Sequence, residues 1–154
     1  MKLEILAVGR LRAPWARSGV GEYLERVARY APVERNEVKP ARGEGAVARE
    51  EEGERLLAAA SIGAADRMVV LDRRGEALSS EGWAKMLRGW ARGGVKRVVL
   101  VVGGASGLSA GVRESARREV SFGRHTMAHE LAQVVLAEQL YRAWTIVRNE
   151  PYHK

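Results

Sequence analysis

The chain has no cysteine, which excludes disulfide bridges, thiolate nucleophiles and cysteine-ligated zinc together. It also has no long apolar segment: the uninterrupted apolar run Val98 to Val102 is far too short to cross a bilayer. The opening stretch MKLEILAVGR has no extended apolar core and no small-residue cleavage site, so it does not have the form of a signal peptide. These absences favour a cytoplasmic protein, and 154 residues are expected to fold as one domain, residues 1–154.

Acidic residues are outnumbered by basic ones. The 26 Lys and Arg residues against 19 Asp and Glu give a net charge of +7 and an isoelectric point near 10.2. Most of the basic residues are arginine, which contacts phosphate bidentately. Such a charge favours a polyanionic partner such as a nucleic acid. A biased overall composition would produce the same excess, so charge alone leaves both explanations open.

The hydrophobic pattern alternates between strand and helix from one end of the chain to the other. We expect strands at 2–9, 33–38, 67–72, 97–104 and 119–122, and helices at 15–30, 46–61, 81–92, 110–118 and 125–144. Continuous apolar runs such as residues 97–102 are typical of strands buried on both faces. The alternation predicts an α/β domain with a mostly parallel sheet flanked by helices.

Two helices carry residues that fit either a structural or a functional role. Trp83, Leu87 and Trp90 fall on one side of their helix, which predicts core packing rather than a platform for stacked bases. The acidic run Glu50 to Glu52 lies in the first half of another helix, where it favours the helix dipole. A solvated helix face is the expected setting of all three carboxylates, with a functional acidic cluster as the alternative.

The stretch VVLVVGGASGLS joins a buried strand to a glycine-rich loop. Glycines at 103, 104 and 107 let a backbone approach a ligand closely, and ligands of open α/β sheets bind beyond the carboxyl ends of strands. The spacing is neither the dinucleotide motif nor a P-loop, and Leu108 stands where a nucleophile elbow needs glycine. A tight turn without a ligand and a small-molecule pocket both remain open.

His125 and His129 have the i, i+4 spacing that could hold zinc on a helix. The intervening TMA lacks the glutamate of the zinc motif and no third ligand lies nearby, so we expect no metal. The ordinary alternative is a histidine at a helix start that donates a hydrogen bond.

The last residues gather basic and aromatic side chains. Arg142, Arg148, Tyr152, His153 and Lys154 could contact an extruded base and its phosphates. A frayed basic tail is the competing interpretation.

Over its whole length the chain resembles the SPOUT-class methyltransferases that modify a pseudouridine of bacterial large-subunit ribosomal RNA, the RlmH family. The resemblance lies in MKLEILAVGR, EYLERVARY, VVLD, VVGGASGLS and TMAHELAQVVLAEQLYRAWTIVRNEPYHK. Its most specific part is EQLYRAW followed by PYHK.

The resemblance implies a SPOUT α/β-knot, in which the C-terminal helix threads a loop to form a trefoil knot. It also implies a homodimer that binds S-adenosylmethionine in the knot and methylates N3 of a pseudouridine in 23S rRNA, within the assembled ribosome or as free rRNA. The alternatives are a SPOUT enzyme acting on transfer RNA or on unmodified uridine, and a non-catalytic RNA- or ribosome-binding module.

By position, the resemblance implies two sets of site residues. The cofactor contacts would be Leu71, Gly103, Phe122, Gly123, Arg124, His125, Thr126 and Met127. Tyr152, His153 and Lys154 would reach across the dimer to bind RNA, with Tyr152, His153 and Arg142 as the catalytic group. In that group His153 is the candidate general base and Arg142 the candidate stabiliser of developing negative charge.

Two positions depart from the family pattern. The segment Phe122 to His125 differs from the usual Leu-Ser type, which affects side-chain contacts to the cofactor more than backbone ones. Gln133 stands where relatives often have arginine, which weakens any functional role for that position.

Overall fold

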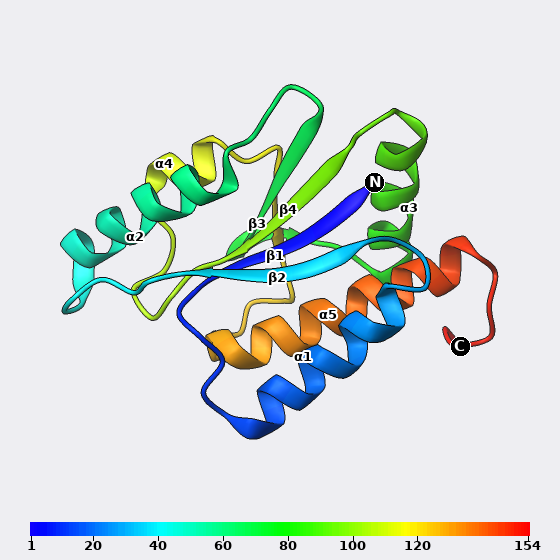
Figure 1. Ribbon diagram of the computed structural model, residues 1–154, viewed down its shortest axis with the longest axis horizontal. Coiled ribbons are helices and arrows are strands. Elements are labelled where there is room, and N and C mark those ends of the chain that lie inside the picture. The colour runs from blue at the N-terminus through cyan, green and yellow to red at the C-terminus, as the bar shows by residue number, and fades with distance from the viewer.

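A parallel sheet of five strands forms the centre of the molecule (Figure 1). The structure is a computed structural model that describes residues 1–154. Its elements are β1 (Lys2–Val8), α1 (Pro14–Val27), β2 (Val33–Val38), α2 (Gly45–Ala60), β3 (Asp66–Ala77), α3 (Ser80–Arg92), β4 (Arg97–Val102), α4 (Ala110–Glu114), β5 (Arg118–Ser121) and α5 (His129–Val147). The strand order is β2-β1-β4-β3-β5, and every neighbouring pair is parallel. The predicted single α/β domain is confirmed.

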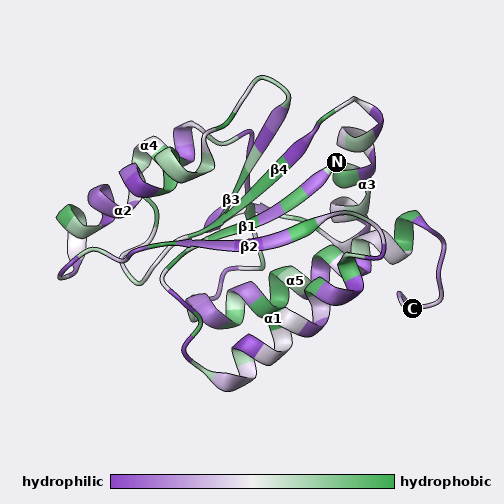
Figure 2. Cartoon of the chain, in the orientation of Figure 1, coloured by the Kyte–Doolittle hydropathy of each residue, from purple (hydrophilic) through white to green (hydrophobic).

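The two faces of the sheet are covered by different helices. Val98 and Leu100 of β4 pack in the core beneath α1, α3 and α5, whereas the alternate residues Val99 and Val101 pack beneath α2 and α4. Figure 2 shows hydrophobic residues along the middle of β3 and β4, with hydrophilic residues where each strand begins. Burial on both faces is why these strands read as continuous apolar runs.

The helix α5 lies between α1 and α3, which explains its apolar composition. Leu136 and Leu140 are completely buried there. On α3, Trp83 and Leu87 are also completely buried and Trp90 is half-buried, so the prediction of core packing is confirmed. No helix of the molecule combines the length and apolar composition needed to span a membrane.

Several predicted boundaries are wrong, among them the end of α4, which lies at Glu114 and not at position 118. The strand β3 continues to Ala77, well past Asp72, because it shifts register and pairs again with β5. The shift needs Gly75, since a Cβ there would lie 2.6 Å from the backbone carbon of Glu119. The helix α5 begins at His129 and not at position 125, because the extended backbone of Ala128 (ψ 135°) precedes it.

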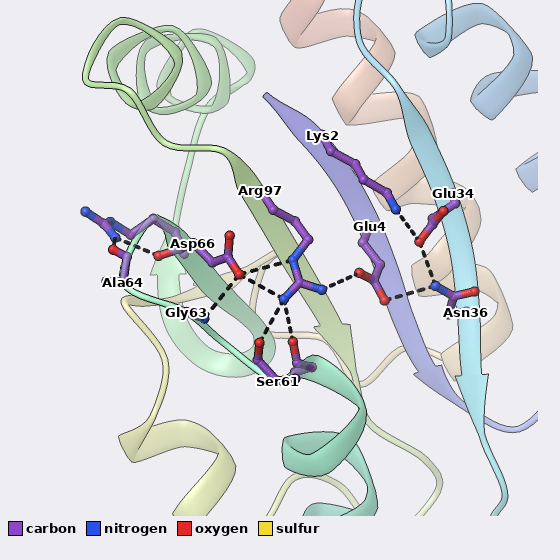
Figure 3. A network of polar contacts seen from close by, with 11 residues as sticks. Lys2, Glu4, Glu34, Asn36, Ser61, Gly63, Ala64, Asp66 and Arg97 are labelled. Atoms are coloured by element: carbon purple, nitrogen blue, oxygen red, sulfur yellow. Dashed lines mark hydrogen bonds and ion pairs between the residues drawn. The ribbon is translucent and has the colours of Figure 1, made fainter.

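Charged side chains hold the amino ends of the strands together (Figure 3). Arg97 of β4 pairs with Glu4 of β1 at 3.1 Å and with Asp66 of β3 at 2.9 Å. The same guanidinium donates to the carbonyl oxygens of Ala60 and Ser61, at the end of α2. This network fixes the amino ends of the strands, and the loops at their carboxyl ends are available for a ligand.

Candidate active site

A pocket of about 600 Å³ lies toward the carboxyl ends of the strands, between residues 71–73 of β3 and the loops that follow β4 and β5. Parallel strands end together at this edge, so segments far apart in the sequence meet there. All predicted cofactor residues except Arg124 line it: Leu71, Gly103, Phe122, Gly123, His125, Thr126 and Met127. Arg124 is exposed and lies outside the lining, so its role stays a prediction. The knot expected in this segment also stays a prediction.

The loop after β4 is both a tight turn and a wall of this pocket. The N–H of Gly107 donates to the carbonyl oxygen of Gly104 at 3.0 Å, and Gly107 has φ +79°. A Cβ on Gly103 would lie 3.0 Å from Leu108 Cδ2. Ser109 then caps α4 by accepting from the N–H of Val112. The two interpretations left open by the sequence are therefore compatible: the turn shapes the pocket.

Asp72 lines the same pocket and was missed by the sequence reasoning. Its carboxylate accepts from Arg74 Nε at 2.9 Å and Arg74 Nη2 at 3.0 Å. The hydrogen bond from the Arg74 side chain, opposed by burial, lowers the pKa of Asp72 below its usual range. Asp72 is therefore ionised, with its charge balanced by Arg74. The available signal was its place directly after Leu71, at the exit of a buried strand.

Glu52 corrects the expectation of a solvated acidic run. It is only 6% exposed, because it faces the sheet from the buried side of α2. Its Oε1 accepts from the N–H of Ala41 at 3.1 Å, and its buried Oε2 has no partner. That oxygen lies 2.9 Å from where a Cβ on Gly104 would be, so the carboxylate packs against the backbone of the pocket loop. Nothing in the sequence separates Glu52 from Glu50 and Glu51.

His125 and His129, both expected on one helix, do not share a helical face. His125 precedes α5, whereas His129 is its first residue. The structure contains no group of three or more His, Asp or Glu side chains arranged to hold a metal. Gln133 is completely buried, accepts from Arg35 Nε at 2.8 Å and donates to the carbonyl oxygen of His129 at 3.2 Å. The position that departs from the family pattern therefore joins β2 to the start of α5.

The three predicted catalytic side chains lie together on the outer surface of α5. Tyr152 donates its hydroxyl to Glu138 Oε1 at 3.0 Å, and Arg142 Nη2 donates to the same oxygen at 2.6 Å. The guanidinium of Arg142 stacks 4.6 Å from the centre of the Tyr152 ring. His153 has Nε2 2.9 Å from Glu81 Oε1 and Nδ1 3.5 Å from Arg142 Nη1. The tail therefore docks on α5 and α3.

Electrostatics fix the protonation states of Arg142 and Tyr152. The hydrogen bond with Glu138 raises the pKa of Arg142, which keeps its positive charge. Burial first, and hydrogen bonds with Tyr23 and Glu138 next, raise the pKa of Tyr152 well above its ordinary value. Tyr152 is therefore neutral at any physiological pH. Lys154 is exposed and makes no ion pair.

The pocket and the tail group do not meet within one chain. The pocket reaches the first turn of α5 at His129 and Ala132, whereas the tail contacts Glu138 and Arg142. From His129 to Arg142 the helix rises by about 20 Å. In Figure 1 the C-terminus lies past the carboxyl end of α5, at the opposite end of this helix from its first turn. No residue of the tail lines the pocket.

Comparison with known proteins places this geometry in a family. Residues 1–153 match the family model described as "Predicted SPOUT methyltransferase". A protein of Anaeromyxobacter sp. (strain Fw109-5) named ribosomal RNA large subunit methyltransferase H is 45% identical, with all of both chains covered. The chain belongs to the SPOUT methyltransferases, in the RlmH family. The resemblance drawn from its motifs is confirmed.

Other members of the RlmH family match over a similar extent. The protein of the same name from Anaeromyxobacter sp. (strain K) is 46% identical with full coverage of both chains, and that of Geotalea uraniireducens (strain Rf4) is 40% identical over 99% of each. The match runs through both the pocket loops and the tail. Family membership makes this chain a methyltransferase, so the pocket at the carboxyl edge is the place where a methyl donor is expected.

Proposed function

We propose that the chain transfers a methyl group from S-adenosylmethionine to N3 of a pseudouridine in the 23S rRNA of the large ribosomal subunit, in the cytoplasm. The observation that carries the proposal is the convergence of the predicted cofactor residues, Arg124 apart, on one pocket at the carboxyl edge of the sheet. The full-length relatives named for methylation of large-subunit rRNA support the substrate class, and the net charge of +7 suits it.

The pocket fits the proposed cofactor. Leu71, Phe122 and Met127 give it apolar walls suited to an adenine ring, and the loop 103–107 offers backbone groups at close range. The ionised carboxylate of Asp72, although paired with Arg74, supplies hydrogen-bond acceptors that suit the ammonium group of the cofactor. When bound there, the cofactor supplies an electrophilic methyl group.

We propose that the working site is shared by two copies of the chain. Trp15 on α1 and Leu131 on α5 are 55% and 42% exposed, and both lie at the amino ends of neighbouring helices. Two-fold packing with the α5 helices antiparallel would cover these side chains. The same packing brings the tail of one subunit to the pocket of its partner, which supplies the half that each chain lacks.

Within this site the tail residues handle the proton of the target base. N3 of pseudouridine must lose its proton before or during the attack on the methyl group. Donation from His153 Nε2 to Glu81 leaves Nδ1 as the acceptor, which is the form that removes a proton. Arg142, held charged by Glu138, stabilises the negative charge that develops on the ring. With no cysteine in the chain, thiolate addition to the ring is not available.

The direct test is mass mapping of methylated nucleosides in rRNA from cells that lack the protein, with the purified protein added back to their ribosomes. One pseudouridine should lose and regain its methyl group. Parallel reactions with free 23S rRNA, intact 70S particles and transfer RNA identify the substrate. Calorimetry with S-adenosylmethionine separates an enzyme from a non-catalytic module, since no binding at millimolar cofactor favours the module.

The role of His153 has its own test. His153→Ala should bind S-adenosylmethionine nearly as the unaltered protein does, because the substitution leaves every residue that lines the pocket unchanged. It should lose about 100-fold or more in the rate of methyl transfer, the size typical of a missing general base. A full methylation rate on intact ribosomes would show that His153 is not the base.

A further inference from the structure

A second groove, of about 870 Å³, lies between α1 and the end of β1. Four arginines line it, Arg10, Arg12, Arg17 and Arg35, and the only carboxylate among its lining residues is Glu37. No part of the proposed reaction uses this groove.

The charges of three of these arginines are not neutralised. Arg10 and Arg12 are exposed, and neither side chain makes a hydrogen bond or an ion pair. Arg17 is also exposed and donates only to neutral carbonyl oxygens, those of Leu11 at 3.2 Å and Arg12 at 2.5 Å. Arg35 is different, because Glu37 pairs with it at 2.6 Å. Against these charges stand only the carboxylates of Glu37, which pairs with Arg35, and Glu130, which accepts from the backbone N–H of Arg12, so the groove keeps an excess of positive charge.

The groove and the cofactor pocket lie on either side of the first turn of α5. Glu130 accepts hydrogen bonds from the backbone N–H groups of Arg12 and Ala13, which fixes the β1–α1 loop on that turn. Gln133, one turn later, is bonded to Arg35. His129, beside Glu130, lines the pocket. Figure 1 shows this loop next to the start of α5, so a strand that leaves the pocket over this turn enters the groove.

The position of these arginines argues against a purely structural role. Arg97, which does hold the fold together, is bonded to two carboxylates and two carbonyl groups, whereas Arg10 and Arg12 are bonded to none. Exposed guanidinium groups without an ion-pair partner suit the phosphate backbone of unpaired RNA.

We propose that Arg10, Arg12 and Arg17 bind the phosphates of the rRNA strand next to the target nucleotide while that nucleotide occupies the pocket. The proposal rests on the proposed function, since it assumes that the substrate is rRNA. It assigns the β1–α1 loop to substrate binding rather than to catalysis. The arginines contact phosphates, so they set affinity and register and leave the methyl-transfer step unchanged.

The test compares two double variants that remove the same charge. R10A/R12A removes two cations of the groove, and R88A/R92A removes two exposed, unpaired cations from the end of α3, which leads to the opposite edge of the sheet. Binding to 70S particles is measured across a salt series, together with the KM and kcat of methyl transfer and the affinity for S-adenosylmethionine. R10K/R12K, which keeps the charge, completes the set.

For R10A/R12A we expect a KM for ribosomes raised about tenfold, a kcat within about twofold, and a logarithmic salt slope smaller by about two, one for each lost phosphate contact. S-adenosylmethionine should bind unchanged. R88A/R92A and R10K/R12K should stay close to the unaltered protein. The proposal is overturned if R10A/R12A keeps the original KM and salt slope, or if R10K/R12K is as weak as R10A/R12A.

Failure of the proposed function gives a different result. If the unaltered protein binds particles with the expected salt slope but methylates no nucleoside, the reaction is wrong and the binding surface stands. If methylation proceeds and R10A/R12A binds particles normally, the proposed arginine surface is refuted and the proposed reaction is retained.

Discussion

At the scale of single residues, Gly75 is the position where β3 comes closest to β5. A Cβ there would lie 2.6 Å from the backbone C and N atoms at Glu119 and Val120. Backbone atoms cannot move aside as the end of a flexible side chain can, so the strands must separate. We predict that Gly75→Ala lowers the free energy of unfolding by about 2–3 kcal/mol, measured by urea denaturation.

Gly89→Ala is the matched control for this change. Gly89 lies on an exposed part of α3, and a Cβ there would meet nothing within 4 Å. Alanine favours the helix, so this variant should gain up to about 1 kcal/mol. Equal effects at positions 75 and 89 would contradict the close strand contact.

Tyr30 gives the molecule a pH dependence at high pH. Its hydroxyl donates to Glu150, and this hydrogen bond, followed by burial, raises the pKa of Tyr30 from 10.0 to about 12. A group whose pKa is higher in the folded state stabilises fully below the unfolded value, and that contribution is lost as the pH rises. We predict that stability falls between pH 10 and about 12 and that Tyr30→Phe reduces this fall, as urea unfolding at pH 8 and 11 would show.

Tyr152 limits how much of the pH dependence the substitution Tyr30→Phe can remove. Its pKa is raised as well, so part of the loss persists in Tyr30→Phe. The free energy of unfolding of the double variant Y30F/Y152F should fall less with rising pH than that of either single variant. A profile unaltered by both substitutions would mean that the two hydroxyl groups do not hold the end of the chain to the helices.

Some single residues of the site could be predicted from the sequence and others could not. Gly103 directly follows a buried strand, a position that favours a ligand site in an open α/β sheet, whereas the segment 122–127 was implied by the family resemblance alone. Glu52 is different, because its burial depends on which face of α2 meets the loop of Gly104, some fifty residues later. A local sequence pattern carries no information about a contact between residues so far apart in the chain.

At the scale of secondary-structure elements, the amino ends of three strands depend on one guanidinium group (Figure 3). Glu4 is 4% exposed, and Arg97 is its ion-pair partner. Breaking a buried pair leaves an uncompensated charge. We predict that Arg97→Ala lowers the free energy of unfolding by about 3 kcal/mol in urea denaturation, and that Glu4→Gln in the same chain restores part of the loss.

The same network predicts behaviour in acid. Burial opposes ionisation of Asp66, but hydrogen bonds from Arg97 and the N–H of Gly63 outweigh it and lower the pKa of Asp66 below 3.8. A lowered pKa in the folded state stabilises above the unfolded value and is lost as the pH falls. Unfolding measured from pH 5 down to pH 2 should therefore be steeper for the unaltered protein than for Asp66→Asn.

The ends of elements were harder to predict than their presence. Every strand and helix was predicted, because each keeps a clear hydrophobic period. The end of β3 depends on pairing with β5, some 45 residues later, so residues after Asp72 form a strand despite their turn-like composition. The start of α5 depends on the loop that closes the pocket, which holds residues 122–128 in non-helical conformations.

At the scale of the whole molecule, the topology separates the proposed site into two halves. The order β2-β1-β4-β3-β5 places β3 between β4 and β5, so residues 71–73 of β3 and the loops after β4 and β5 are neighbours. The sequence could identify both halves by their motifs. It could not show that α5 holds them apart, since that depends on which end of the helix each half contacts.

The separation leads to a prediction about mixed dimers. Gly103→Val should disable the pocket, since even a Cβ there lies 3.0 Å from Leu108, and His153→Ala should disable the tail. Each variant alone carries the same defect in both of its sites. A heterodimer of the two joins the normal pocket of the His153→Ala chain to the normal tail of the Gly103→Val chain, which makes one complete site.

Random mixing makes half of the dimers mixed, and each mixed dimer has one complete site of two, so co-refolded variants should recover about a quarter of the original methylation rate. The measurement is transfer of labelled methyl groups to ribosomes before and after subunit exchange. If the tail instead served the pocket of its own chain, every chain would hold a defective site and mixing would restore nothing. Once His153→Ala alone is shown to be inactive, the result therefore distinguishes a shared site from two separate ones.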